Sequence, residues 1–228
     1  MSCSLLILRP TEGALETAKR AKDQGLQTII DPFFVIEPMA WSALAASQYD
    51  ALMLTSANAI KYGGHKLLEY SQLPVLAVGE ATAAAARNAG FQVADTGNGG
   101  AAQLLQSPGA SQFSHILRLT GKDHVKTEAA TQQITVRQVY QARALPLGDT
   151  AQAALRQRQI ILLYSVRAAK ILAAESDRLQ LDRSLHDVAA LSPNVAQAAG
   201  KGWKSVQAAE SPTDDALLSL AGRLCQGK

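Results

Sequence analysis

The sequence predicts an α/β protein built from two doubly wound, parallel β-sheets. In residues 75–90, four apolar residues run up to Gly79, an alanine-rich segment follows, and Gly90 ends it. This order is typical of a buried strand, a tight turn and a helix, because glycine can turn there without a Cβ clash. Residues 187–200 repeat the same order. Two copies of one arrangement are therefore expected, with ligand sites where the parallel strands end.

The first part of the chain alternates strands and helices. Residues 5–10 predict a strand that a proline ends, and Thr11 can cap a helix that stops before Gly25. A second strand begins at residues 28–30. Residues 31–38 have a proline near each end and no helical period, so they predict an extended linker outside the compact sheet.

Residues 50–106 continue the pattern. A third strand is expected at residues 50–56, where Thr55 or Ser56 caps a helix running to about residue 70. Glycines at positions 63 and 64 weaken that helix. The strand and helix of residues 75–90 come next. A fifth strand at residues 92–96, a glycine turn and a short helix complete the block.

The second half begins again with a strand at residues 115–121. A helix is expected at residues 122–133 and a strand at residues 134–140, and residues 141–146 form a second extended linker. The next expected elements are a helix at 150–158, a strand at 160–165, a helix at 166–179, the strand–turn–helix repeat at 187–200 and a strand at 205–210. A last helix is expected to start at residues 211–214, which place serine at N-cap, proline at N1 and aspartate at N3.

Corresponding turns in the two halves recur at nearly constant spacing. The pairs are Arg9 with Arg118 and Ser56 with Ser165 at a spacing of 109, Gly79 with Ser192 at 113, and Gly97 with Ser211 at 114. Two five-stranded βα units with right-handed crossovers are therefore expected.

The composition is that of an ordinary globular chain. Of 228 residues, 47% are hydrophobic and 18% are charged, and the apolar runs have the length of strands, so no transmembrane helix is expected. A net charge of +3 is too small to indicate nucleic-acid binding. The N-terminus lacks the layout of a signal peptide, which favours a cytoplasmic location. Cys3 and Cys225 are accordingly expected to be free thiols, with a terminal disulfide as the alternative.

Local motifs argue against metal and nucleotide sites. Residues 97–100 do not form a dinucleotide-binding fingerprint, and the sequence contains no phosphate-binding loop motif, so nucleotide-dependent enzymes are disfavoured. The histidines share no local spacing, so surface or core positions are expected for them rather than metal ligation. They are His65, His115, His124 and His186.

Several short motifs follow one another in a characteristic order. They are Leu8-Arg9-Pro10, LTSANA at residues 54–59, AVGEATA at residues 77–83, Val139-Tyr140, Ser165, and ESPT at residues 210–213. In this order and at these spacings, the chain resembles the uroporphyrinogen-III synthase family over essentially its whole length. It departs from the family's usual pattern at Leu8, Tyr164, Ser192, Asn194 and Val195.

The resemblance implies two flavodoxin-like lobes joined by a two-stranded hinge, with one lobe inserted into the other. The first lobe would comprise residues 1–35 and 147–228, and the second lobe residues 39–142. Residues 36–38 and 143–146 would be the hinge strands.

The resemblance also implies an activity. The family closes the linear tetrapyrrole hydroxymethylbilane to uroporphyrinogen III, with inversion of ring D and loss of water, and uses no metal or organic cofactor. The substrate cyclises unaided to the uninverted isomer, so the enzyme must chiefly hold it in the inverting geometry. Such positioning can contribute up to about 7–11 kcal/mol. By family position, Tyr140 is the candidate catalytic residue, as proton donor to the departing hydroxyl.

The acetate and propionate groups of this substrate indicate which residues bind it. Backbone N–H groups at helix starts attract carboxylates by about 0.3–1 kcal/mol each, and Arg9 can add a bidentate contact. Helix capping, packing of Tyr140 at the hinge and an internal salt bridge of Arg9 are alternative roles for these side chains. The expected binding residues are Arg9, Thr55, Ser56, Asn58, Gly79, Thr82, Gly121, Ser165, Ser192 and Asn194.

A second function is compatible with the same fold. A two-lobe small-molecule binding or sensor protein without catalytic activity would share this architecture, so turnover must distinguish the two. The favoured function implies a cytoplasmic monomer that binds neither nucleic acid nor membrane. Its expected partners are the substrate hydroxymethylbilane and, transiently, hydroxymethylbilane synthase.

Overall fold

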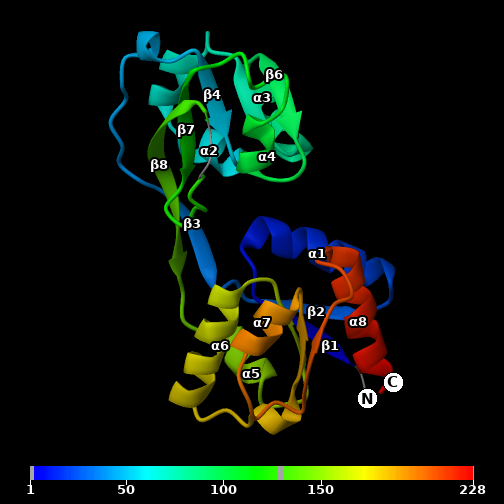
Figure 1. The fold of residues 1–228 in the computed structure, drawn as a ribbon. Coiled ribbons are helices and arrows are strands. Elements are labelled where there is room, and N and C mark those ends of the chain that lie inside the picture. The colour runs from blue at the N-terminus through cyan, green and yellow to red at the C-terminus, as the bar shows by residue number, and fades with distance from the viewer. Residues whose placement is uncertain (1–2, 128–130, 228) are drawn as a thin grey trace. The chain divides into compact units, whose positions relative to one another are not determined.

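Two compact units make up the chain, and each contains one β-sheet with helices on both faces (Figure 1). The computed structural model describes residues 3–127 and 131–227. The described residues up to Val35 and from Arg143 onward form the first unit, and those within Ile36–Ala142 form the second. The predicted α/β class with two parallel sheets is confirmed.

The first unit holds a five-stranded sheet in the order β11-β10-β9-β1-β2, and every neighbouring pair of strands is parallel. In chain order this is the 2-1-3-4-5 arrangement of flavodoxin-like sheets. The strands are β1 (Ser4–Ile7), β2 (Gln27–Ile30), β9 (Ile160–Leu163), β10 (Asp187–Ala190) and β11 (Ser205–Ala208).

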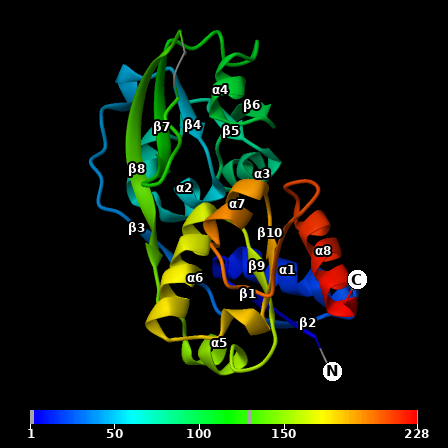
Figure 2. The ribbon, with the colours of Figure 1, turned by 60° about the horizontal axis from the view of Figure 1, so that its bottom comes forward.

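Helices cover both faces of the first sheet (Figure 2). On one face, Ile7 and Leu162 pack in a buried core with Ala14 and Leu217, which belong to α1 (Thr11–Asp23) and α8 (Asp214–Gln226). The helices on the other face are α5 (Asp149–Ala154), α6 (Val166–Arg178) and α7 (Pro193–Ala198).

The second unit holds a six-stranded sheet in the order β3-β8-β7-β4-β5-β6. From β8 to β6 all neighbours are parallel and repeat the first sheet's order, with β7 and β4 in the places of β1 and β9. The strands are β3 (Phe34–Pro38), β4 (Ala51–Leu54), β5 (Val75–Val78), β6 (Val93–Gly97), β7 (His115–Gly121) and β8 (Gln133–Ala144).

The strand β3 is longer than the hinge strand that the resemblance implied at residues 36–38, and it belongs to the second sheet. Residues 31–38 were expected to be a linker outside the sheet, but β3 lies beside β8 at the sheet edge. The long β8 offers a hydrogen-bonding edge, and an edge strand tolerates proline. The side chain of Gln141 donates to Glu37 at 2.9 Å. Residues 36–38 fall in the second unit and residues 143–146 in the first; their role as a hinge remains a prediction.

Helices also cover both faces of the second sheet. On one face α2 (Ala57–Tyr62) and α3 (Glu80–Asn88) pack on the core around Leu54 and Leu117, and on the other α4 (Ala101–Leu105) packs near Ile116. Short 3-10 helices occur at Ala46–Gln48, His65–Tyr70 and Arg183–Leu185. None of the helices in residues 3–127 and 131–227 combines the length and apolar character needed to cross a membrane.

Local side-chain chemistry accounts for some of the predicted helix starts. The Ser56 side chain accepts a hydrogen bond from the Asn58 N–H, and the Ser165 side chain accepts one from the Ala168 N–H. Both serines are therefore N-caps, as predicted. Thr11, however, is the first residue of α1 and not its cap, and Pro10 precedes it without a side-chain capping bond. The last helix starts later than expected: Thr213, rather than Ser211, caps α8.

Two predicted helices are wrong. The helix expected from residue 57 to residue 70 ends at Tyr62, because Gly64 adopts a φ of +68°. Residues 122–127 and 131–132 of the helix expected at 122–133 are turns and irregular chain, and residues 128–130 lie outside the described residues. The guanidinium of Arg118 takes the Val125 carbonyl as an acceptor, which competes with helical hydrogen bonding.

The expectation of free thiols is also wrong. Cys3 and Cys225 form a disulfide, with their Cα atoms 5.6 Å apart. Cys3 precedes β1 and Cys225 lies in the last turn of α8, and both side chains pack against one core cluster. The sequence separation of 222 residues hid this proximity.

Replacing Cys225 by serine should lower the free energy of unfolding of the first unit by about 2–4 kcal/mol under oxidising conditions. Urea denaturation of the wild type and of Cys225→Ser would measure the difference. Peptide mapping without reductant should also recover a Cys3–Cys225 linked peptide; quantitative alkylation of both thiols in the native, oxidised protein would contradict the structure.

Ser165→Ala should cost about 1 kcal/mol of stability, since it removes the acceptor for the Ala168 N–H. Ser192→Ala is the matched control, because Ser192 precedes α7 without making a side-chain capping bond. Urea denaturation should therefore give a clearly smaller loss for Ser192→Ala. Equal losses would show that capping does not set the contribution of Ser165.

Candidate functional site

Each sheet has one place where the strand order reverses. It lies between β1 and β9 in the first unit and between β7 and β4 in the second. Open parallel sheets bind ligands outside the carboxyl ends of the strands at this point. The residues at the ends of these four strands therefore define the two candidate sites.

The strand register aligns the two sites. The N-caps Ser165 and Ser56 follow β9 and β4 at equivalent places, so Ile161 corresponds to Leu52. Ile161 lies beside Leu6, and Leu52 lies beside Leu117. Position 6 in β1 therefore corresponds to position 117 in β7.

This register corrects one pairing that the sequence spacing suggested. Arg9 corresponds to Thr120, and Arg118 corresponds to Ile7. The expected match of Arg9 with Arg118 is therefore wrong by two residues. A shift of two keeps a side chain on the same face of a sheet but moves it by one pleat.

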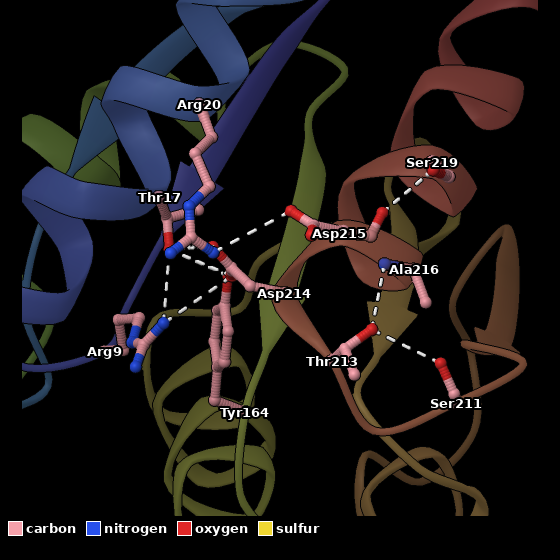
Figure 3. A network of polar contacts seen from close by, with 10 residues as sticks. All are labelled: Arg9, Thr17, Arg20, Tyr164, Ser211, Thr213, Asp214, Asp215, Ala216 and Ser219. Atoms are coloured by element: carbon pink, nitrogen blue, oxygen red, sulfur yellow. Dashed lines mark hydrogen bonds and ion pairs between the residues drawn. The ribbon is translucent and has the colours of Figure 1, made fainter. Parts of the chain in front are cut away.

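In the first unit, a carboxylate occupies the centre of the site (Figure 3). Asp214, the first residue of α8, accepts hydrogen bonds from the Thr17 hydroxyl at 3.0 Å and from the Tyr164 hydroxyl. Arg20 donates to its other oxygen at 3.0 Å. These contacts connect α1, α8 and the end of β9.

Arg9 completes this cluster. Its Nη1 donates to Thr17 at 3.2 Å and lies 3.6 Å from an oxygen of Asp214, and its guanidinium carbon is 4.2 Å from the centre of the Tyr164 ring. Burial raises the pKa of Tyr164, and its hydrogen bond to Asp214 raises it further. The protein's own groups therefore satisfy the polar side chains at this site.

The second unit has a cavity of about 410 Å³ at the corresponding place. Two hydroxyls from the central strands meet on its wall, since the Thr55 and Thr120 oxygens are 3.1 Å apart. The lining residues come from the ends of β4, β7 and β8, the start of α4 and the segment after β7. They are Thr55, Gly99–Ala102, Arg118, Thr120, Asp123–Thr127 and Tyr140.

Tyr140 is held in the cavity wall by a close approach to Gly121. These residues are partners in the β7–β8 register, and a Cβ atom on Gly121 would lie 2.7 Å from the tyrosine ring. The Lys122 N–H also donates to the Tyr140 carbonyl at 2.9 Å. Glycine at position 121 thus leaves the space that the ring occupies.

Arg118 is the most buried charged group in this wall, with 3% of its surface exposed. Its Nη1 donates to the Val125 carbonyl at 3.1 Å and to the Thr127 hydroxyl. Its Nε has no hydrogen-bond partner among residues 3–127 and 131–227. Burial lowers the pKa of Arg118, and the nearby Tyr140 opposes this shift. A smaller cavity of about 250 Å³ also borders Arg118.

Of the predicted site residues, Tyr140 and Thr55 line the cavity, and Gly121 lies against the Tyr140 ring. Four others in the second unit form helix starts instead of lining it. Ser56 caps α2 through the backbone of Asn58. Gly79, with a φ of +87°, precedes α3, and the Thr82 side chain is almost fully buried in that helix.

The remaining predicted residues lie in the first unit. Arg9 belongs to the Asp214 cluster, and Ser165 caps α6. Ser192 and Asn194 lie at the start of α7, where Asn194 is exposed.

Sequence reasoning missed Arg118, Thr120, His124 and Lys126 as cavity residues. Arg118 carried a usable signal, because a charged residue interrupts the apolar run His-Ile-Leu-Arg-Leu of a buried strand. His124 and Lys126 carried none, since the segment was expected to be helical. The described parts of the chain bring no three histidine, cysteine or acidic side chains together as a metal site.

Comparisons with known proteins identify the family. The family model for uroporphyrinogen-III synthase HemD matches residues 16–219. No curated protein sequence matches the chain.

Solved structures agree in fold. The uroporphyrinogen-III synthetase of Helicobacter pylori aligns with a TM-score of 0.66 at 18% identity, over 98% of this chain and 100% of that one. A mutant uroporphyrinogen III synthase of the extremely thermophilic bacterium Thermus thermophilus aligns with a TM-score of 0.53 at 14% identity, over 99% and 100%. At these identities the structures establish the shared fold, and the family match covers most of the sequence. The chain belongs to the uroporphyrinogen-III synthase family.

Proposed function

We propose that the protein closes hydroxymethylbilane to uroporphyrinogen III, with inversion of ring D and loss of water. The observation that carries this proposal is the cavity that Tyr140 and Thr55 line, with Gly121 packed against the Tyr140 ring. These three residues lie on different strand segments and are among the eleven that the family resemblance indicates from the sequence alone. Membership of the synthase family supports the same conclusion.

The proposed chemistry begins when the terminal hydroxyl of the substrate departs. Tyr140 donates its phenolic proton to the departing hydroxyl, which leaves as water, and the substrate becomes an electrophilic azafulvenium cation. The substituted carbon of ring D then attacks to form a spiro intermediate. The spiro bond to the neighbouring ring breaks and the free pyrrole carbon of ring D closes the macrocycle. That carbon then loses its proton to the Tyr140 phenolate, which restores the tyrosine and gives uroporphyrinogen III.

Most of the selectivity comes from positioning in this proposal. The uninverted isomer forms without catalysis, so the protein must favour one attacking carbon over another. Hydroxyls and N–H groups at the strand ends can hold the carboxylate arms of the substrate. The proposed binding residues are Arg9, Thr55, Ser56, Asn58, Gly79, Thr82, Gly121, Ser165, Ser192 and Asn194.

The proposal extends to the setting in which the protein works. A cytoplasmic monomer without a nucleic-acid or membrane partner fits a pathway that passes a small, reactive tetrapyrrole between enzymes. Transient contact with hydroxymethylbilane synthase would shorten the time in which the substrate cyclises unaided.

A coupled assay tests the proposed function. Hydroxymethylbilane is generated in situ, and the products are oxidised and separated into isomers I and III by chromatography. Isomer III that depends on this protein is the expected result. Isomer I alone, from a folded sample, would overturn the proposal and favour a non-catalytic binding protein.

Tyr140→Phe should reduce the rate of isomer III formation by about a hundredfold or more, because it removes the proton donor and keeps the ring. The matched control is Tyr62→Phe, since the Tyr62 ring lies 6.3 Å from that of Tyr140. The control should retain the wild-type isomer ratio. Near-normal isomer III from Tyr140→Phe would remove this residue from the mechanism.

Gly121→Ala should displace the Tyr140 ring, because the new Cβ would lie 2.7 Å from it. We expect isomer III formation to fall by about tenfold or more while the protein stays folded. The same assay measures the rate, and circular dichroism checks the fold. An unchanged rate would show that the position of the ring does not matter.

A further inference from the structure

The two sites differ in how their polar groups are satisfied. In the first unit, Asp214 at the start of α8 supplies a carboxylate to Thr17, Tyr164 and Arg20, and lies close to Arg9. In the second unit, α4 follows β6 as α8 follows β11 in the first unit. Its start, residues 99–102, reads Gly-Gly-Ala-Ala and contains no acid.

The two sites also differ in what covers them. In the first unit α1 follows β1 directly and packs on the core around Ile7. In the second unit the strand position of Ile7 is taken by Arg118, and residues 122–127 after β7 form no helix. A buried arginine therefore borders two cavities where the first unit has a packed helix.

Within residues 3–127 and 131–227, two hydrogen bonds to uncharged groups hold the Arg118 guanidinium in place. Its Nη1 contacts are a carbonyl and a hydroxyl, both neutral. Its Nε is buried without a partner in the described parts of the chain. Guanidinium groups favour carboxylates because two donors can engage two oxygens, and an unpaired buried charge is costly.

We infer that Arg118 forms a carboxylate-binding subsite, in which a carboxylate of the ligand binds in the cavity that Arg118 and the start of α4 line. The inference rests on the proposed function for the identity of the ligand, an acetate or propionate arm of the tetrapyrrole. Tyr140 lines the same cavity, so an arm bound at Arg118 would hold the substrate beside the proposed proton donor.

A half-buried arginine of the first unit provides a control. Arg183 also has a buried Nε without a partner in the described residues, and it donates to the carbonyls of Lys201 and Ala173. Its charge, however, is paired with Asp177 at 2.8 Å. Arg183→Met therefore removes comparable structural bonds from the first unit without removing the proposed subsite.

Two measurements test the subsite. The first is equilibrium binding of uroporphyrin III, the oxidised and unreactive form of the proposed product, which retains its carboxylates. The second is the KM for hydroxymethylbilane in the isomer assay. Arg118→Met should weaken uroporphyrin binding and raise KM by about ten- to a hundredfold, the range of a charge-assisted hydrogen bond. Arg118→Lys should restore part of the loss, and Arg183→Met should change neither quantity.

A variant that adds a negative charge beside Arg118 tests the subsite independently. Ala101→Asp places an acid on the first residue of α4, as Asp214 is on the first residue of α8. A negative charge suits a helix start, so folding should be preserved. This variant should compete with the ligand for Arg118 and weaken binding by about tenfold. If Arg118→Met fails to fold, Arg118→Lys and Ala101→Asp decide the question.

The outcomes separate the subsite from the proposed function. Wild-type isomer III formation, with unchanged binding and KM in Arg118→Met and Ala101→Asp, would overturn the subsite and leave the function intact. Arg118-dependent uroporphyrin binding without isomer III from the wild type would support the subsite and overturn the function. Equal effects of Arg118→Met and Arg183→Met would mean that Arg118 acts only in packing.

Discussion

The geometry of the parallel sheet governs the rest of this structure. Parallel strands end at one edge, and at the reversal of strand order no crossover chain runs directly over that edge. Polar side chains that end these strands must therefore find partners in neighbouring elements, in water or in a ligand. The two units share this constraint because β1 and β9 in one correspond to β7 and β4 in the other.

The units satisfy the constraint in different ways. In the first, Asp214, Thr17 and Arg9 close the site with hydrogen bonds between α1, α8 and the strand ends. In the second, the helix after β7 is absent over residues 122–127, and Arg118 borders a cavity. The two copies of the fold therefore differ at this place: in the first unit Asp214 pairs with neighbouring side chains, and in the second Arg118 borders a cavity in which we propose that a carboxylate binds. This division fits an enzyme that mainly positions a substrate rich in carboxylates.

Much of the fold could be predicted because local rules set it. Apolar runs, the caps Ser56 and Ser165 and the turn at Gly79 gave the parallel repeats and their boundaries. The disulfide was only the alternative expectation, and the sequence pattern did not place β3 in the sheet, since both features depend on pairings made only in the folded chain. The candidate site was partly predictable: family position selected Thr55, Gly121 and Tyr140. Arg118 was missed because the sequence spacing matched it with Arg9; the strand register shows that it replaces a core residue, Ile7.

The central claim is that Arg118 in the second unit's site binds a carboxylate of the ligand. Nitrogen-15 NMR of the arginine Nε–H groups during titration with uroporphyrin III tests it most directly. We expect the Arg118 Nε–H signal to shift and to become protected from exchange as a carboxylate supplies an acceptor, while the Arg183 signal changes little. An Arg118 signal that stays unchanged at saturation, while other arginine signals shift, would contradict the account.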